Sequence, residues 1–432
     1  MKNDKYTKKY FYLAKKILFP ICRSLTGNGT KKTLNIIKKE FKNLKIKSIK
    51  SGTKVFDWKV PKEWNIQKAF VKDKNGKILI NFKKNNLHIV SYSYPVNKNV
   101  KKNILLKRLH TSTKLKNAIP YVTSYYKKYW GFCVSHNEKQ KLIKNYDEND
   151  LFKICIESTL KKDGKLNWGE LVLKGISKEE ILISTYICHP SMANNELSGP
   201  IVAMSLINFF KNKKLNKTLR FVFIPETIGS IIYINKNLKN LKKNTIGGFN
   251  LTCIGDDRNH SCMLSKYENS LSDKALIKAY KDLKIKFKKY SFLERGSDER
   301  QYNSPGIDLN LTSIFRSKYG EYPEYHTSYD DFNLVSLSGI TGGFEVAKKA
   351  IEILQNFETP KAKFLCEPFM TKRKLYPTLS KSKLNLKSKK LMDFLQYSDG
   401  SNSLQDISKL IQVNIEETKK IYNTLKENSL LK

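Results

Sequence analysis

Three side chains that could bind a metal or move a proton follow apolar segments of the sequence. His189 comes directly after the run ILISTYIC, and Glu226 comes two residues after RFVFI. His326 lies in a loop rich in Tyr, Glu and Asp, SKYGEYPEYHTSYDD. Two histidines and one carboxylate from separate loops are the smallest ligand set for a catalytic zinc with an open position. The three residues therefore indicate a metal or acid-base centre.

Glu226 could take either of two roles in such a centre. A carboxylate at the end of a buried strand is partly desolvated, and burial raises its pKa towards the range of a general base. A bound metal would instead keep the carboxylate ionised as a ligand. As a base, Glu226 would deprotonate a water on the metal, and the hydroxide would attack an amide carbonyl. The sequence leaves both roles open.

The elements that must position these residues read as an α/β sheet with parallel strands. Continuous apolar runs are typical of strands buried on both faces, and here they alternate with helical patterns. In such sheets the reactive groups lie at the carboxyl ends of the strands. The expected strands and helices, in chain order, occupy residues 179–190, 200–212, 219–226, 245–255, 272–283, 307–315 and 339–356.

Two further modules flank this α/β pattern. From Ser51 the sequence shows short β-like segments with turn signals, including Asn75-Gly76 and Asp163-Gly164. Three short helices with polar caps close the chain, which predicts a winged-helix or helix-turn-helix module. The predicted domains are the α/β domain at 1–50 and 151–370, an inserted β-rich domain at 51–150, and the winged-helix module at 375–432.

Composition argues against nucleic acid as the main partner. The 432 residues carry a formal net charge of +42, but the excess Lys is spread over every region. An even spread indicates solvated faces and compositional bias rather than one phosphate-binding surface. Glu416 and Glu417 in the candidate recognition helix would also repel phosphate.

Cysteine usage and hydropathy indicate a cytoplasmic protein without a membrane span. The seven cysteines are an odd number with no C-x-x-C pair, which argues against a disulfide framework and a thiolate zinc site. No apolar run approaches the roughly 20 residues needed to cross a bilayer. We expect a reducing, cytoplasmic environment.

Several long segments resemble the zinc aminopeptidase-like exopeptidases, specifically a bacterial branch with an inserted β domain and a C-terminal winged helix. The resemblance covers nearly the whole chain and implies a three-layer domain with a mostly parallel mixed sheet. Relatives often carry names that link them to polysaccharide biosynthesis. The matching segments are PICRSLTGNG, SGTKVFDWKVPKEWNI, IPYVTSYYKKYWGFCVSH, STYICHPSMANNELSGP, FIPETIGS, LTCIGDD, RGSDERQYNSPGID and RSKYGEYPEYHTS.

The resemblance implies a set of metal ligands. His189 looks like the first zinc ligand and His326 like the last one. Asn195 falls where the superfamily has its metal-bridging Asp, and an amide oxygen is a poorer zinc ligand than a carboxylate. The adjacent Glu196 could supply the missing charge.

Two departures from the superfamily pattern reduce the expected number of metal ions. Pro225 replaces one carboxylate of the usual Glu-Glu pair, and Thr252 stands where the superfamily has another Asp ligand. The resemblance therefore implies one zinc ion, held by the two histidines and a carboxylate. Residues expected to contact substrate are Asp257, Asp298, Arg300, Arg316 and Tyr322, and either arginine could hold a substrate carboxylate by bidentate hydrogen bonds.

The resemblance implies a metal-dependent hydrolase that cleaves an amide or peptide bond with Glu226 as base. Its substrate would be a small peptide, an aminoacyl compound or a sugar-derived compound. Asn195, Pro225 and Thr252 keep an alternative open, because metal-site decay would produce such changes. That alternative is a catalytically weakened binding or scaffold protein in polysaccharide biosynthesis. The sequence also leaves homo-oligomer formation open.

Overall fold

An eight-stranded mixed sheet forms the centre of the largest domain. The computed structural model describes residues 4–377 and 386–432, and the sheet has the order β1-β10-β12-β11-β13-β16-β14-β15. Strands β12, β11, β13 and β16 run parallel, whereas β1 pairs antiparallel with β10, β10 with β12, and β14 with β16. The strands are β1 (Lys45–Lys50), β10 (Lys165–Leu173), β11 (Ser177–Tyr186), β12 (Lys217–Ile224), β13 (Thr245–Leu251), β14 (Ser261–Met263), β15 (Lys288–Tyr290) and β16 (Leu311–Phe315).

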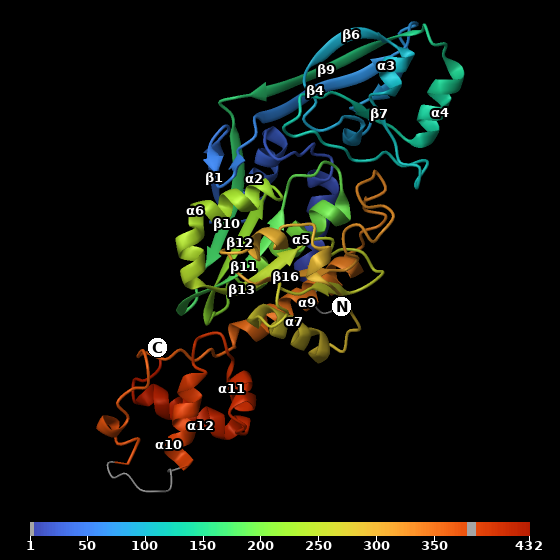
Figure 1. Cartoon of the computed structure of the whole chain (residues 1–432). Helices are drawn as coiled ribbons and strands as arrows, with labels where there is room; N and C mark the ends of the chain where they lie inside the picture. The colour runs from blue at the N-terminus through green and yellow to red at the C-terminus, as the bar shows by residue number, and fades with distance from the viewer. Residues whose placement is uncertain (1–3, 378–385) are drawn as a thin grey trace.

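Helices cover both faces of this sheet and complete three layers (Figure 1). Successive residues of a strand face opposite sides, so Ile181 and Ile183 belong to one core while Leu182 belongs to the other. Helices α1, α5, α7 and α9 contribute to the first core, and α6 contributes to the second. The helices are α1 (Asp4–Leu13), α2 (Asn28–Glu40), α5 (Ser198–Phe210), α6 (Ile228–Asn244), α7 (Leu271–Asp282), α8 (Glu299–Tyr302) and α9 (Leu337–Gln355).

The inserted module lies beyond one end of the large sheet and contains a four-stranded antiparallel sheet of order β5-β4-β9-β6 (Figure 1). Gly76, with a φ of 81°, lies in the turn between β4 and β5, so the hairpin predicted at Asn75-Gly76 is confirmed. The module's main elements are β4 (Glu63–Lys72), β5 (Ile78–Asn81), β6 (Val96–Lys101), α3 (Lys102–Leu106), α4 (His136–Asn145) and β9 (Leu151–Lys161). Its short strands are β2 (Lys54–Val55), β3 (Trp58–Lys59), β7 (Leu109–His110) and β8 (Phe132–Cys133).

Strand β9 lies in the inserted sheet, although the sequence assigned residues from 151 onward to the α/β domain. Its inward residues Phe152, Ile154 and Ile156 are buried in the core that the insert shares with α6. The turn at Asp163-Gly164 therefore joins strands of two different sheets. We propose that the insert extends through β9.

The C-terminal module has a core of its own. Its three helices, α10 (Leu386–Gln396), α11 (Leu404–Leu410) and α12 (Ile415–Glu427), bury a separate apolar cluster that includes Met370. Lys361 and Ala362 also pair with residues of this module, so we propose that it begins before the predicted residue 375. Across residues 4–377 and 386–432, no helix combines the length and apolar character needed to cross a membrane.

Candidate metal centre

The structure brings His189, Glu226 and His326 together at the carboxyl ends of the parallel strands. His189 follows β11 and Glu226 follows β12, and these neighbouring strands end at the same edge of the sheet. The Nε2 atom of His189 lies 3.7 Å from Oε2 of Glu226. The ring centroids of His189 and His326 are 5.3 Å apart. His189 thus lies close to both Glu226 and His326.

A buried carboxylate and a buried guanidinium fix the orientation of His189. Oε2 of Glu196 lies 2.9 Å from Nδ1 of His189, and a carboxylate only accepts, so Nδ1 carries the proton and donates it. Arg23 Nε donates to Oε1 of Glu196 at 3.1 Å and to the His189 carbonyl oxygen at 2.9 Å. Burial alone lowers the pKa of His189, but Cys188 and Glu196 raise it well above the usual value. Nε2 is left facing Glu226.

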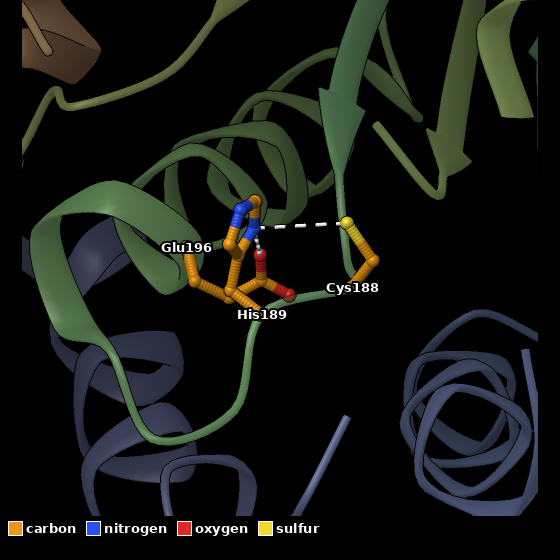
Figure 2. A group of neighbouring side chains, drawn as sticks. All are labelled: Cys188, His189 and Glu196. Carbon is orange, nitrogen blue, oxygen red and sulfur yellow. Dashed lines mark hydrogen bonds and ion pairs between the residues drawn. The ribbon is translucent and has the colours of Figure 1, made fainter. Parts of the chain in front are cut away.

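Cys188, His189 and Glu196 form a cluster with the donor types of a metal site (Figure 2). Their donor atoms lie within 4.8 Å of one another. In this cluster, however, His189 contributes Nδ1, which is already bonded to Glu196. Both Glu196 oxygens have hydrogen-bond partners, and the cation of Arg23 would repel a second cation. We therefore interpret this cluster as a support for His189.

One ring nitrogen of His326 has the properties of a metal-binding atom. Its Nε2 is buried and has no hydrogen-bond partner among the residues that the structure describes. Burial and the neighbouring His189 lower the pKa of His326 to about 3, so its ring is neutral and keeps a lone pair. Tyr325 stacks on the ring with a centroid separation of 3.9 Å. The φ of His326 is 56°, a costly conformation for a residue with a side chain.

Glu226 is held by two contacts in a largely buried position. The Ser297 hydroxyl donates to Oε1 of Glu226 at 2.7 Å, and the Glu226 backbone N donates to Sγ of Cys188 at 3.2 Å. Its side chain is 21% exposed. Burial raises the pKa of Glu226, although the nearby His189 and the hydrogen bond from Ser297 act in the opposite direction. A carboxylate with a raised pKa suits a general base.

Asn195 and Thr252 are joined by a tyrosine hydroxyl. The Tyr186 hydroxyl donates to Oδ1 of Asn195 at 2.9 Å and lies 2.6 Å from the Thr252 hydroxyl. Both side chains are neutral, and all three are buried. Asn195 belongs to a π-helical turn, Ala193–Leu197. The first three backbone N–H groups of this turn donate hydrogen bonds to the Asp330 carboxylate. The positions that the resemblance compares with acidic ligands thus hold neutral side chains that bond to one another through Tyr186.

Two of the five predicted substrate contacts, Asp298 and Arg300, lie beside Glu226. Oδ1 of Asp298 accepts from Thr227 N at 2.7 Å and from the Ser230 hydroxyl at 2.8 Å. Arg300 donates to the Thr227 hydroxyl at 2.7 Å. Burial, followed by the charge of Glu226, raises the pKa of Asp298 to about 8. These side chains hold the backbone that follows Glu226, where Thr227 has a φ of 62°.

The other three predicted contacts have structural partners elsewhere. Arg316 lies 2.9 Å from Nε2 of His260, and a Cβ at Gly342 of α9 would meet its guanidinium. Asp257 accepts from the hydroxyls of Ser336 and Ser338 at the start of α9. Tyr322 donates to Asp330 at 2.8 Å. None of these hydrogen bonds involves His189, Glu226 or His326.

Sequence reasoning assigned no role to several residues that complete the site. Arg23, Ser297 and Asp330 contact the predicted residues directly, and Tyr121 reaches the site from the insert. Only Arg23 could have been suspected from the sequence. It is a charged residue in the otherwise mainly uncharged segment PICRSL, and a charged residue at a buried position usually has a partner. The others lie in polar loops where the sequence has no periodicity.

The fold is that of the zinc aminopeptidases. A zinc aminopeptidase from Bacillus subtilis superposes with a TM-score of 0.60 at 13% identity, covering 81% of this chain and 94% of that one. A crystal structure from Clostridium acetobutylicum, provisionally described as a peptidase, matches with a TM-score of 0.79 and 38% identity over 100% of this chain and 97% of its own. The predicted fold class is thereby confirmed.

The family follows from the sequence comparison. Residues 11–357 match the model described as a domain of unknown function (DUF4910), and the chain belongs to that family. Residues 358–432 match a winged helix-turn-helix model, which confirms the predicted C-terminal module. A Clostridium acetobutylicum relative is 40% identical over 400 residues, which cover 90% of this chain and 88% of the relative. That relative is provisionally named a polysaccharide biosynthesis protein with an aminopeptidase-like domain.

Proposed function

We propose that the chain is a zinc-dependent hydrolase that cleaves an amide or peptide bond in a small peptide, aminoacyl or sugar-derived substrate. The observation that carries the proposal is the buried Nε2 of His326, which has no partner among the described residues and lies on a ring next to that of His189. A buried nitrogen without a partner costs free energy, and a metal ion would satisfy it. His189 Nε2 and His326 Nε2 would hold the ion, with Glu226 beside them.

The donor chemistry supports one zinc ion rather than two. Two imidazole nitrogens and a carboxylate match the ligand types of catalytic zinc. Asn195 and Thr252 offer no negative charge, and their oxygens are engaged with the Tyr186 hydroxyl. Glu196 supports His189 from its Nδ1 side. A second cation would therefore lack charged ligands.

The residues around the ion would divide the work of hydrolysis. When bound, zinc supplies Lewis acidity to the carbonyl group and acidifies water. Glu226 accepts the proton of the attacking water, since burial raises its pKa and Ser297 holds its other oxygen in place. Glu196 and Arg23 keep the His189 ring oriented throughout.

A Glu226→Gln variant tests this proposal in a screen of aminoacyl p-nitroanilides. Loss of a general base lowers kcat by about 10²- to 10⁴-fold, while zinc content stays at the wild-type value. Glu268→Gln is the matched control, because it makes the same change at an exposed carboxylate that pairs with Lys289. Equal turnover in wild type and Glu226→Gln would refute the assignment.

A binding or scaffold role in polysaccharide biosynthesis is the second candidate. The neutral Asn195, Tyr186 and Thr252 network favours it, because the superfamily has acidic ligands in this region. The name of the Clostridium acetobutylicum relative points the same way. In that case, purified wild-type protein would hold no zinc and would hydrolyse none of the substrates.

A further inference from the structure

The inserted module is hydrogen-bonded to the loop that carries His326. Tyr121 N donates to the His326 carbonyl oxygen at 2.7 Å, and Ser328 N donates to the Ile119 carbonyl oxygen at 2.8 Å. Ile119 N in turn donates to the Ser328 hydroxyl at 3.0 Å. His326 has a φ of 56°, and such a backbone persists only where the surrounding structure enforces it. These three bonds therefore help to hold His326 in its left-handed conformation.

The insert also contacts the loop that follows His189. Asn86 opens a short 3₁₀-helical turn, Asn86–His88, which comes after the hairpin of β4 and β5. Its Nδ2 donates to the Ser191 hydroxyl at 2.7 Å and to the Pro20 carbonyl oxygen at 2.9 Å. Ser191 comes two residues after His189, and its φ of 42° is again left-handed. The insert thus contacts each histidine loop at a residue with an unfavourable backbone conformation.

One side chain of the insert lies against both histidine rings. The ring centroid of Tyr121 is 5.3 Å from that of His189 and 5.2 Å from that of His326, with interplanar angles of 64° and 85°. The two histidine centroids are themselves 5.3 Å apart, so the three rings form a triangle with nearly equal sides. Aromatic rings at these separations favour an edge-to-face arrangement. Tyr121 therefore stabilises the orientation of both histidine rings.

The separation of the two loops decides whether one metal ion can reach both rings. Zinc binds histidine nitrogens at about 2.0 to 2.1 Å, so one ion accepts only a narrow range of separations. Within the α/β domain, Asp330 links the loops by accepting from the backbone N–H groups of Ala193 and Asn195. That link lies four residues from His326 in the sequence, whereas the insert bonds to the His326 carbonyl oxygen itself. The insert is thus a second link, closer to the metal-binding rings.

Resting on the zinc site proposed above, we propose that Asn86 and Tyr121 of the insert are positioning residues, which hold the two histidine loops at the separation that one zinc ion requires. Asn86 acts through Ser191, and Tyr121 acts through the two rings and the His326 carbonyl oxygen. Linkage is reciprocal, so a docked insert that tightens zinc binding is itself stabilised on the α/β domain by zinc. The insert is thereby part of the metal centre.

Asn86→Ala tests the contact with the His189 loop, because it removes both hydrogen bonds of the Nδ2 group. Loss of an outer partner of a metal ligand lowers metal affinity by about 10- to 100-fold, and Asn86 acts at one remove from His189, so we expect a loss of about tenfold. Asn65→Ala is the matched control, since Asn65 is another insert residue that bonds to the α/β domain. Its Oδ1 accepts from Asn28 N at 2.7 Å. The control should bind zinc as wild type does.

Tyr121→Leu tests the ring contacts, because it removes the ring and keeps the backbone N–H group that bonds to His326. We expect zinc affinity to fall by about tenfold here too. Tyr129→Leu is the matched control, since the Tyr129 ring lies 5.8 Å from that of His110 within the insert. Competition with a chromophoric chelator measures all four affinities. Wild-type affinity in Asn86→Ala and Tyr121→Leu, or equal losses in the variants and their controls, overturns the proposal.

Hydrogen exchange of the wild-type protein gives a readout that needs neither a variant nor turnover. By the reciprocity of linkage, zinc should slow exchange at the amides of Tyr121 and Ser328 by about tenfold. Phe82 N, which donates to the Ala69 carbonyl oxygen at 2.9 Å inside the inserted sheet, is the internal control and should be slowed less. Equal slowing of all three amides, or none, contradicts a specific coupling between the insert and the metal.

Three outcomes separate this inference from the function on which it rests. If all variants bind zinc equally tightly and wild type hydrolyses aminoacyl p-nitroanilides, the hydrolase function stands and the inference fails alone. If Asn86→Ala and Tyr121→Leu lose zinc affinity but wild type hydrolyses nothing, the inference stands and the hydrolase function fails. If wild type binds no zinc, both fail.

Discussion

Replacing Glu196 with Gln tests whether this carboxylate holds His189 ready for a metal. The substitution keeps the size of the side chain and removes its charge. The contacts of 2.9 Å to His189 Nδ1 and 3.1 Å to Arg23 Nε then lose their charge assistance. Loss of such an outer partner of a metal-binding histidine lowers metal affinity by about 10- to 100-fold. We therefore expect the zinc affinity of Glu196→Gln to be about 10- to 100-fold lower than that of wild type.

The same substitution also leaves Arg23 buried without a counter-charge. The side chains of Arg23 and Glu196 are both 0% exposed, and breaking a buried pair costs about 3 to 5 kcal/mol. Arg23 keeps its hydrogen bonds to the carbonyl oxygens of Leu18 and His189, so we expect the lower end, about 3 kcal/mol. Urea unfolding measures this loss.

Glu180→Gln is the matched control for both effects. It breaks another largely buried pair, in which Arg220 donates to the two Glu180 oxygens at 2.7 and 2.6 Å. Glu180 lies near the start of β11, at the opposite end of the strand from His189. The control should lose stability and keep its zinc affinity, measured by competition with a chromophoric chelator. Wild-type zinc affinity in Glu196→Gln would refute the reasoning, and complete loss of binding would make Glu196 a ligand.

Two further predictions concern other parts of the chain. Burial and Arg316 lower the pKa of His260 to about 4, so folding excludes a proton and the stability that His260 contributes is lost as pH falls from about 6.5 to about 4. In a His260→Gln variant the urea midpoint of unfolding should depend less on pH over this range. A pH dependence equal to that of wild type would contradict the assignment. In the winged-helix module, Glu416 and Glu417 occupy the first turn of α12 and would repel DNA phosphates. We therefore expect wild type to bind duplex DNA weakly at 150 mM salt, and a Lys420→Glu variant to bind it equally weakly. A tenfold loss in that variant would show real phosphate contacts.

The sequence predicts the α/β fold because its strands are buried on both faces. Runs such as ILISTYIC leave no polar face, and alternation with helices implies parallel strands whose carboxyl ends meet. That geometry suffices to bring His189 and Glu226 to one edge of the sheet, and they lie 3.7 Å apart. The helices of the C-terminal module are predicted by their caps, and Ser403 does form a capping box with Asp406.

The remaining features depend on contacts between residues far apart in the sequence. Arg23 and Glu196 are separated by 173 positions, and no local pattern pairs them. Tyr121 of the insert is joined to His326 by a backbone hydrogen bond, which does not depend on residue type and so cannot be predicted from the sequence. The pairing of β9 depends on such contacts too. The sequence predicts a strand at residues 152–159 but not its partners, and its pairing with β4 and β6 assigns it to the inserted sheet.

Locating the metal by anomalous X-ray diffraction tests the central claim most directly. Crystals of zinc-loaded protein are measured on both sides of the zinc absorption edge, with His326→Ala as the comparison. The account predicts one anomalous peak per chain, in contact with Nε2 of His189 and Nε2 of His326 and next to Glu226, and no peak in the variant. A peak bound to Cys188 and Glu196, or no peak in wild-type crystals, would contradict the account.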